Sequence, residues 1–142
     1  MRLLELLVAV SIMSLLAATA VWVAEDIPPS VATDAAARQL AREIQAARQL
    51  AMTKGITVEM AFFRAQRCYI IRQEFMGAPP ARRVDLPAGT LWISIPFESL
   101  RFHPSGRATR NGTFILGHEQ WQGQIRVVVA PSTGRVRLEY PQ

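Results

Sequence analysis

The chain has 142 residues, of which 50% are apolar and 19% are charged, and its formal net charge is +5. This length suits one globular domain with an additional segment and excludes two sizeable cores. Its single cysteine, Cys68, excludes an internal disulfide and is expected to be a small buried hydrophobe in a strand. All but one of the basic residues are arginine, which either favours phosphate and carboxylate partners or reflects the composition of the source genome.

The first predicted element is an apolar run from Leu3 to Ala24, in which Glu5 is the only charged residue. As a helix the run is about 33 Å long, at 1.5 Å per residue, and a bilayer core is about 30 Å thick. Glycine and proline are absent from the run, which ends before Glu25-Asp26 and Pro28-Pro29. These features predict a transmembrane or filament-core helix within residues 1–27.

Glu5 distinguishes between three interpretations of this run. A cleavable signal peptide has an uninterrupted apolar core, and both Glu5 and the length of the run argue against it. A plain signal anchor explains Glu5 poorly, because an acid inside a membrane segment costs roughly 2.5 to 3.5 kcal/mol. The third interpretation is a register group: the free α-amino group of Met1 in a neighbouring copy would neutralise Glu5, and an unpaired buried charge would disfavour other alignments.

Residues 31–54 are predicted to form a second, amphipathic helix. Ser30 or Thr33 is expected to cap its start, and Lys54-Gly55 is typical of a helix end. The apolar residues at helical spacing are Ala36, Ala37, Leu40, Ile44, Ala47 and Ala51. Since this stripe needs a partner layer, we expect the helix to cover a sheet.

From residue 56 to about residue 140 the pattern predicts antiparallel strands separated by turn residues. A hairpin is expected at its start and another at its end, the latter around Ser132-Thr133-Gly134, and Asn111-Gly112 is a strong turn signal. The predicted strands are 56–63, 66–74, 91–95, 100–103, 113–116, 124–130 and 135–140. A long helix followed by antiparallel strands predicts an α+β fold with the helix packed on a sheet.

The segment Met1-Arg2-Leu3-Leu4-Glu5-Leu6-Leu7-Val8-Ala9-Val10 resembles the start of mature type IV pilins and pseudopilins. In those proteins a prepilin peptidase cleaves before the first residue and methylates the new amine. The resemblance therefore assigns processing and N-methylation to Met1, where the family usually has Phe. It assigns assembly register to Glu5, which stands at the family's position.

Later segments resemble the GspH/FimT group of minor pilins and pseudopilins. The matching segments are Ala46-Ala47-Arg48-Gln49-Leu50-Ala51, Phe102-His103-Pro104-Ser105-Gly106-Arg107, Gly112-Thr113-Phe114-Ile115-Leu116 and Thr133-Gly134-Arg135-Val136-Arg137. The resemblance implies a pilin fold with two parts: the N-terminal helix of residues 1–27 and a globular head of residues 28–142.

No catalytic or metal-binding pattern stands out in the sequence. His103 and His118 have no Cys, Asp or second His at the spacing of metal ligands, and Cys68 has no neighbouring base. We therefore expect neither an enzyme nor a cofactor.

The C-terminal hairpin is the remaining candidate for a binding site. Arg135 and Arg137 fall on one face of a strand, and Arg126 lies on the partner strand. With Arg107 and Arg110 on another turn, this face would suit the DNA backbone. The Gly-Arg-x-Arg pattern resembles FimT-like members, where it is linked to DNA capture, but it also suits a charged edge strand that prevents aggregation.

The resemblance implies a structural minor pilin or pseudopilin of a type II secretion system or a type IV pilus, acting in filament initiation or at the tip. Its partners would be other pilin subunits, the inner-membrane assembly platform and prepilin peptidase. It would sit in the bacterial inner membrane with its head outside the cytoplasm, and then in a filament. The alternatives are a DNA-binding pilin of a competence pilus and a membrane-tethered binding domain that never polymerises.

Overall fold

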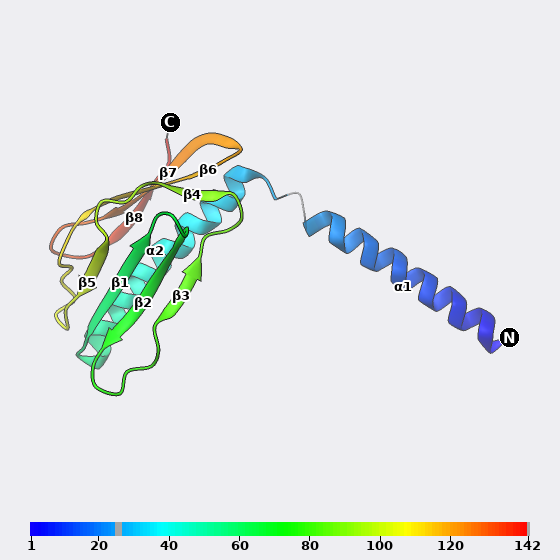
Figure 1. The fold of residues 1–142 in the computed structure, drawn as a ribbon, viewed down its shortest axis with the longest axis horizontal. Helices are drawn as coiled ribbons and strands as arrows, with labels where there is room; N and C mark the ends of the chain where they lie inside the picture. Colours follow the sequence, from blue (N-terminus) through cyan, green and yellow to red (C-terminus); the bar gives the residue numbers. More distant parts are fainter. Residues whose placement is uncertain (25–26, 142) are drawn as a thin grey trace.

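The computed structural model describes residues 1–24 and 27–141, with side chains for residues 1–18 and 27–141. Two helices precede a β region, and the first helix stands apart from the rest in Figure 1. The remainder forms a head, in which the second helix packs against the strands. The helix end that we predicted at Glu25-Asp26 lies outside the described residues.

Helix α1 spans Arg2–Ala24 and confirms the first predicted helix. Two of its hydroxyls are satisfied within the helix: Ser11 Oγ donates to the carbonyl of Leu7 at 2.7 Å, and Ser14 Oγ to that of Val10 at 2.8 Å. Within the described residues, we find no helix whose length and hydropathy would suffice to cross a membrane. The predicted span continues through residues 19–26, whose side chains are not among those described.

Helix α2 spans Pro29–Lys54 and buries the predicted stripe of alanine, leucine and isoleucine. It ends as predicted: Gly55 is left-handed, with φ of 65°, and its N–H donates to the carbonyl of Ala51. The predicted cap was wrong. The helix begins at Pro29, whose fixed φ suits the first turn, no side chain caps it, and Thr33 Oγ1 instead donates to the carbonyl of Pro29 at 2.8 Å.

In the described part of the chain, the strands form two antiparallel sheets of four strands each. The first sheet has the order β3-β2-β1-β5, and the second has the order β4-β6-β7-β8. The strands are β1 (Thr57–Phe63), β2 (Cys68–Glu74), β3 (Arg82–Asp85), β4 (Thr90–Ser94), β5 (Ser99–Phe102), β6 (Gly112–His118), β7 (Trp121–Val129) and β8 (Val136–Glu139). The α+β fold is thereby confirmed.

The core lies between the two sheets and α2, which contacts strands of both sheets. Its centre is an aromatic cluster in which Phe62 and Phe114 have ring centroids 4.5 Å apart and Phe97 packs edge-on at 5.3 Å from Phe114. Leu40 and Ile44 of α2 are fully buried against it. Cys68 is also buried, as expected.

Two features of the β region differ from the sequence prediction. Strand β3 was not predicted, because its Arg82-Arg83 start lacks an apolar alternation; it pairs with β2 at the sheet edge, where charged residues are common. Asn111-Gly112 does not close a hairpin, because β5 and β6 belong to different sheets. The predicted hairpins β1–β2 and β7–β8 are both present.

Candidate functional site

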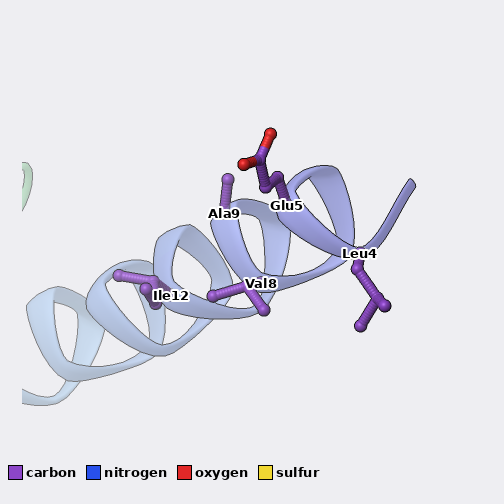
Figure 2. A pocket seen from close by; sticks show the side chains of 5 residues that line it. All are labelled: Leu4, Glu5, Val8, Ala9 and Ile12. Atoms are coloured by element: carbon purple, nitrogen blue, oxygen red, sulfur yellow. The ribbon is translucent and has the colours of Figure 1, made fainter. Parts of the chain in front are cut away.

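Glu5 lies in the first turn of α1, and its carboxylate points away from the helix (Figure 2). Ala9, one turn later, extends from the same side of the helix in this view. A shallow hollow of about 400 Å³ adjoins them, and it is lined by Leu4, Glu5, Val8, Ala9 and Ile12. A single carboxylate therefore borders an otherwise apolar surface.

The Glu5 carboxylate has no ion-pair partner among the residues that the structure describes. Its backbone N–H faces the carbonyl of Met1 at 3.5 Å, as the helix begins. An acid in the first turn is favoured by the helix dipole, but that effect is modest. Met1 itself is fully exposed.

The apolar side chains around Glu5 are exposed. Leu3 is 80% exposed, Leu6 66% and Leu7 63%. Soluble proteins rarely leave so large a continuous apolar surface uncovered, and such a surface marks contact with protein or lipid. This end of α1 is accordingly a candidate contact surface.

The outer face of the β7–β8 hairpin carries the predicted arginines. Arg126 lies opposite Glu139, and Arg137 lies opposite Val128. Because Arg137 Nη2 is 2.8 Å from Glu139 Oε1, this arginine is already paired, although its side chain is 72% exposed. Arg126 lies on the strand that pairs with β8, as the sequence predicted, and Glu139 is an acidic neighbour that we had not considered.

Arg48 of α2 connects two turns that carry predicted residues. Its Nε donates to the carbonyl of Gly106 at 3.0 Å. A Cβ built on Gly134 would lie 3.2 Å from Arg48 Cδ and 3.3 Å from the Gly106 carbonyl, so the two turns are in contact. The next residue of each turn, Arg107 and Arg135, is exposed. The fold thus brings these two arginines to one region of the head.

The side chain of Arg48 is partly buried in this contact. Helical spacing places Arg48 beside the buried Ile44 and Ala51, but it does not reveal the partner, because the Gly106 carbonyl is 58 positions away. Arg110 is exposed in the segment before β6, and the structure gives no contact that brings it to the hairpin. Of the five predicted arginines, only Arg137 has an acidic partner within the described part of the chain.

The shifted pKa values belong to structural contacts elsewhere. The Tyr140 hydroxyl donates to Asp34 Oδ1 at 2.6 Å, which lowers the pKa of that carboxyl, and Arg38 at 2.8 Å lowers it further. Burial raises the pKa of Tyr69 above its ordinary range. Across the described ranges, no group of three His, Cys, Asp or Glu side chains is placed to hold a metal ion.

Comparison with known families decides the class of this protein. Residues 36–133 match the sequence profile of the family described as type II transport protein GspH. The chain belongs to this family. No curated protein sequence matches it significantly. Members of the GspH family are structural pseudopilins and not enzymes.

Solved structures of low identity share the fold of this GspH-family chain. The minor pseudopilin EpsH of the Vibrio cholerae type 2 secretion system has a TM-score of 0.61 and 16% identity, covering 77% of this chain and 97% of that one. The type IV minor pilin FimU of Pseudomonas aeruginosa has a TM-score of 0.62 and 20% identity, covering 78% and 92%. The pilin-like fold of the head is thereby confirmed.

The region that matches the family includes part of the arginine surface and none of the Glu5 surface. It contains Arg107, Arg110 and Arg126, but it ends before Arg135 and Arg137 and begins after α1. Family membership therefore identifies the head. The Glu5 surface lies outside the matched region.

Proposed function

We propose that this chain is a minor pilin or pseudopilin that assembles through α1 into a filament of a type II secretion system or a type IV pilus. The observation that carries the proposal is the exposed apolar surface of α1 with a lone carboxylate at Glu5. It stands beside a head with the fold of minor pseudopilins and pilins. A helix of this kind is suited to a bilayer and to the apolar core of a filament.

Glu5 acts as the register group of assembly. Removing a carboxylate from water costs several kcal/mol unless it is paired. The α-amino group of Met1 in an adjacent subunit supplies the pair only when the two helices are offset along their axes. Other offsets leave Glu5 unpaired among apolar side chains, and the correct alignment is selected by that penalty.

Assembly through α1 implies three kinds of partner. Prepilin peptidase generates and methylates the N-terminus at Met1, the inner-membrane platform moves the subunit from bilayer to filament, and pilin-like subunits surround α1. The head stays outside the cytoplasm throughout. A minor subunit of this kind acts in filament initiation or at the tip.

Substitution of Glu5 tests the proposal directly. Glu5→Ala leaves the chain in the membrane fraction but lowers its recovery in sheared filaments at least tenfold, equivalent to about 1.4 kcal/mol of lost pairing. Ser11→Ala on the same helix is the matched control, because the Ser11 hydroxyl bonds only to its own helix. Equal recovery of Glu5→Ala and wild type would refute the register role. Absence of the wild-type chain from filaments would favour a tethered domain that never polymerises.

A second candidate function is DNA binding by the head, as in a competence pilus. It is supported by the contact between the turns of Gly106 and Gly134, which brings Arg107 and Arg135 to one region. Both lack an acidic partner among the described side chains. Phosphate contacts of this kind bind DNA without reading its sequence.

Mobility-shift titrations of the full chain in detergent test this candidate. Arg135→Ala is expected to weaken binding more than Arg137→Ala, because Arg137 is already paired with Glu139. Binding should also weaken steeply as salt increases. DNA affinity that is independent of salt would contradict the phosphate-contact explanation. So would DNA affinity that is unchanged in a chain carrying both Arg135→Ala and Arg137→Ala.

A further inference from the structure

A polar cleft of about 360 Å³ lies between helix α2 and the turn that joins β7 to β8. Residues of α2 form one wall, and the turn with the start of β8 forms the other. The lining residues are Gln45, Arg48, Gln49, Gly134, Arg135 and Val136. Arginine and glutamine side chains supply hydrogen-bond donors, and no acidic side chain is among these lining residues. The α2–β8 cleft is therefore rich in donors and positively charged.

Arg48 is held in place at this cleft before any ligand binds. Its side chain is partly buried, and its Nε donates to the carbonyl of Gly106 at 3.0 Å. A Cβ built on Gly134 would lie 3.2 Å from Arg48 Cδ, so the β7–β8 turn packs against the stem of the side chain. The two terminal nitrogens, Nη1 and Nη2, have no hydrogen-bond partner among the described residues. A fixed guanidinium thus has donors to spare.

The elements that form the cleft leave its two guanidinium groups without a counter-ion. Neither Arg48 nor Arg135 has an ion-pair partner in the described part of the chain. The acidic residues of α2 and β8 already bind other arginines: Asp34 binds Arg38, Glu43 binds Arg82 and Glu139 binds Arg137. A partly buried charge is costly unless it is paired, so the cleft favours an anionic ligand.

The charge near the cleft favours phosphate over carboxylate. Arg107 follows Gly106 directly, is exposed, and has no acidic partner within the described ranges. With Arg48 and Arg135 it makes three unpaired guanidinium groups in one region of the head. One carboxylate carries a single charge, whereas a DNA strand carries a phosphate at every nucleotide. The planar fork of donors in arginine also matches the oxygens of phosphate.

We propose that the α2–β8 cleft is an oxyanion site that takes a phosphate group. Arg48 is its fixed donor, Arg135 contributes from the opposite wall, and the amides of Gln45 and Gln49 donate at the rim. This inference rests on the second candidate function, DNA binding by the head, in which the phosphate belongs to the DNA backbone. It adds a wall of α2 to the arginines of the two turns.

Glutamate substitution at the rim tests the site without altering the core. Gln49 is exposed on α2, and Gln49→Glu places a carboxylate at the cleft, where it competes with phosphate for Arg48. Binding of a fluorescent single-stranded thymidine oligonucleotide to the full chain in detergent should weaken about fivefold or more. Gln66→Glu is the matched control, because it makes the same change in net charge at an exposed residue outside the cleft. It should weaken binding less than about twofold.

The salt dependence of binding tests Arg48 itself. Arg48→Gln removes one phosphate contact, so the slope of log affinity against log salt should decrease in magnitude by about 0.7 on a single strand. Loss of the contact with Gly106 alone would lower the thermal stability of the head and leave this slope unchanged. An unchanged slope would therefore refute Arg48 as a phosphate donor.

The remaining outcomes separate the cleft from the candidate function. Equal weakening by Gln49→Glu and Gln66→Glu would refute the cleft and leave DNA binding by the head standing. Absence of oligonucleotide binding in the wild type would refute the candidate function. Inorganic phosphate then tests the cleft alone: shifts of the Gln45 side-chain amide signals in NMR spectra, lost in Gln49→Glu, would support the oxyanion site, and unchanged signals would refute it. Tighter binding of a polyglutamate peptide than of the oligonucleotide would overturn the assignment to phosphate.

Discussion

The two helices of this chain are similar in length and opposite in how their apolar side chains are covered. Helix α1 has 23 residues and exposes its leucines, with Leu7 at 63%. Helix α2 has 26 residues and buries Leu40 and Ile44 completely beneath two sheets. The stripe of α2 is covered within one molecule, whereas the surface of α1 is left exposed and is available to the other subunits of the proposed assembly.

This contrast separates stability from assembly. Substitutions along α2 should change the free energy of unfolding of the head, because its apolar contacts are intramolecular. Substitutions along α1 should leave that free energy unchanged and alter only association with membrane or filament. Measurements on matched positions of the two helices can therefore confirm or break the distinction.

The largest expected effect is on α2. Ile44→Ala should lower the free energy of unfolding of the head by about 2–5 kcal/mol, because it leaves a cavity between helix and sheets. Leu7→Ala on α1 should change it by less than about 0.5 kcal/mol. Chemical denaturation of the full chain in detergent, followed by tryptophan fluorescence, measures both. A comparable loss from Leu7→Ala would show that α1 packs on the head and would end the distinction.

Much of α2 could be predicted because periodicity reports burial directly. Leu40, Ile44 and Ala47 recur on one face, and all three are buried. Gly55 was predictable as the helix end, since a left-handed residue there favours glycine. The hairpins were predictable for a similar reason, because strand alternation and turn residues are local signals.

What the sequence did not reveal depends on contacts between distant residues. Strand β3 is defined by its pairing with β2, and its residues have no apolar alternation of their own. The role of Arg48 depends on the Gly106 carbonyl, 58 positions away. Glu139 follows Arg137 by two residues in the sequence, so its position as an acidic neighbour is a local signal. Only the strand register shows that Glu139 also faces Arg126. The positions of such groups follow from tertiary structure.

A second prediction concerns the turn of Gly134, which packs against Arg48 of α2 and the turn of Gly106. Gly134 has a φ of 64°, and an added Cβ would lie 3.0 Å from the buried Phe102 ring. Gly134→Ala should therefore lower the free energy of unfolding by about 2–4 kcal/mol, from a strained backbone and overpacking together. Gly77→Ala is the matched control, since Gly77 has a similar φ of 81° and open space around it. It should lose about 1–2 kcal/mol, the backbone contribution alone. Equal losses in thermal or chemical denaturation would mean that the contact between the turns adds nothing.

A third prediction concerns the start of α2, where the Tyr140 hydroxyl is hydrogen-bonded to Asp34. Tyr140→Phe removes the hydrogen bond to Asp34 and should lower the free energy of unfolding by about 0.5–1 kcal/mol at pH 7. Because that bond lowers the pKa of Asp34 in the folded state, its contribution is present above the unfolded value near 3.8 and is lost as the pH falls through the folded value. The difference between Tyr140→Phe and wild type should thus shrink below about pH 4. A difference that is constant from pH 7 to pH 3 would exclude the carboxylate as the partner.

The smallest expected effect is at Tyr69, beside the Glu43–Arg82 ion pair that links α2 to β3. Its hydroxyl is buried and has no hydrogen-bond partner among the described residues, while its ring packs on Phe62 and Trp92. Tyr69→Phe keeps the ring contacts and removes an unpaired polar atom, so the free energy of unfolding should stay within about 1 kcal/mol of wild type or rise. Tyr69→Ala, which removes the ring as well, should cost about 3–5 kcal/mol. A loss above about 2 kcal/mol for Tyr69→Phe would mean that the hydroxyl is bonded, to a buried water molecule for example. In that case the polar link between α2 and the first sheet extends beyond the ion pair.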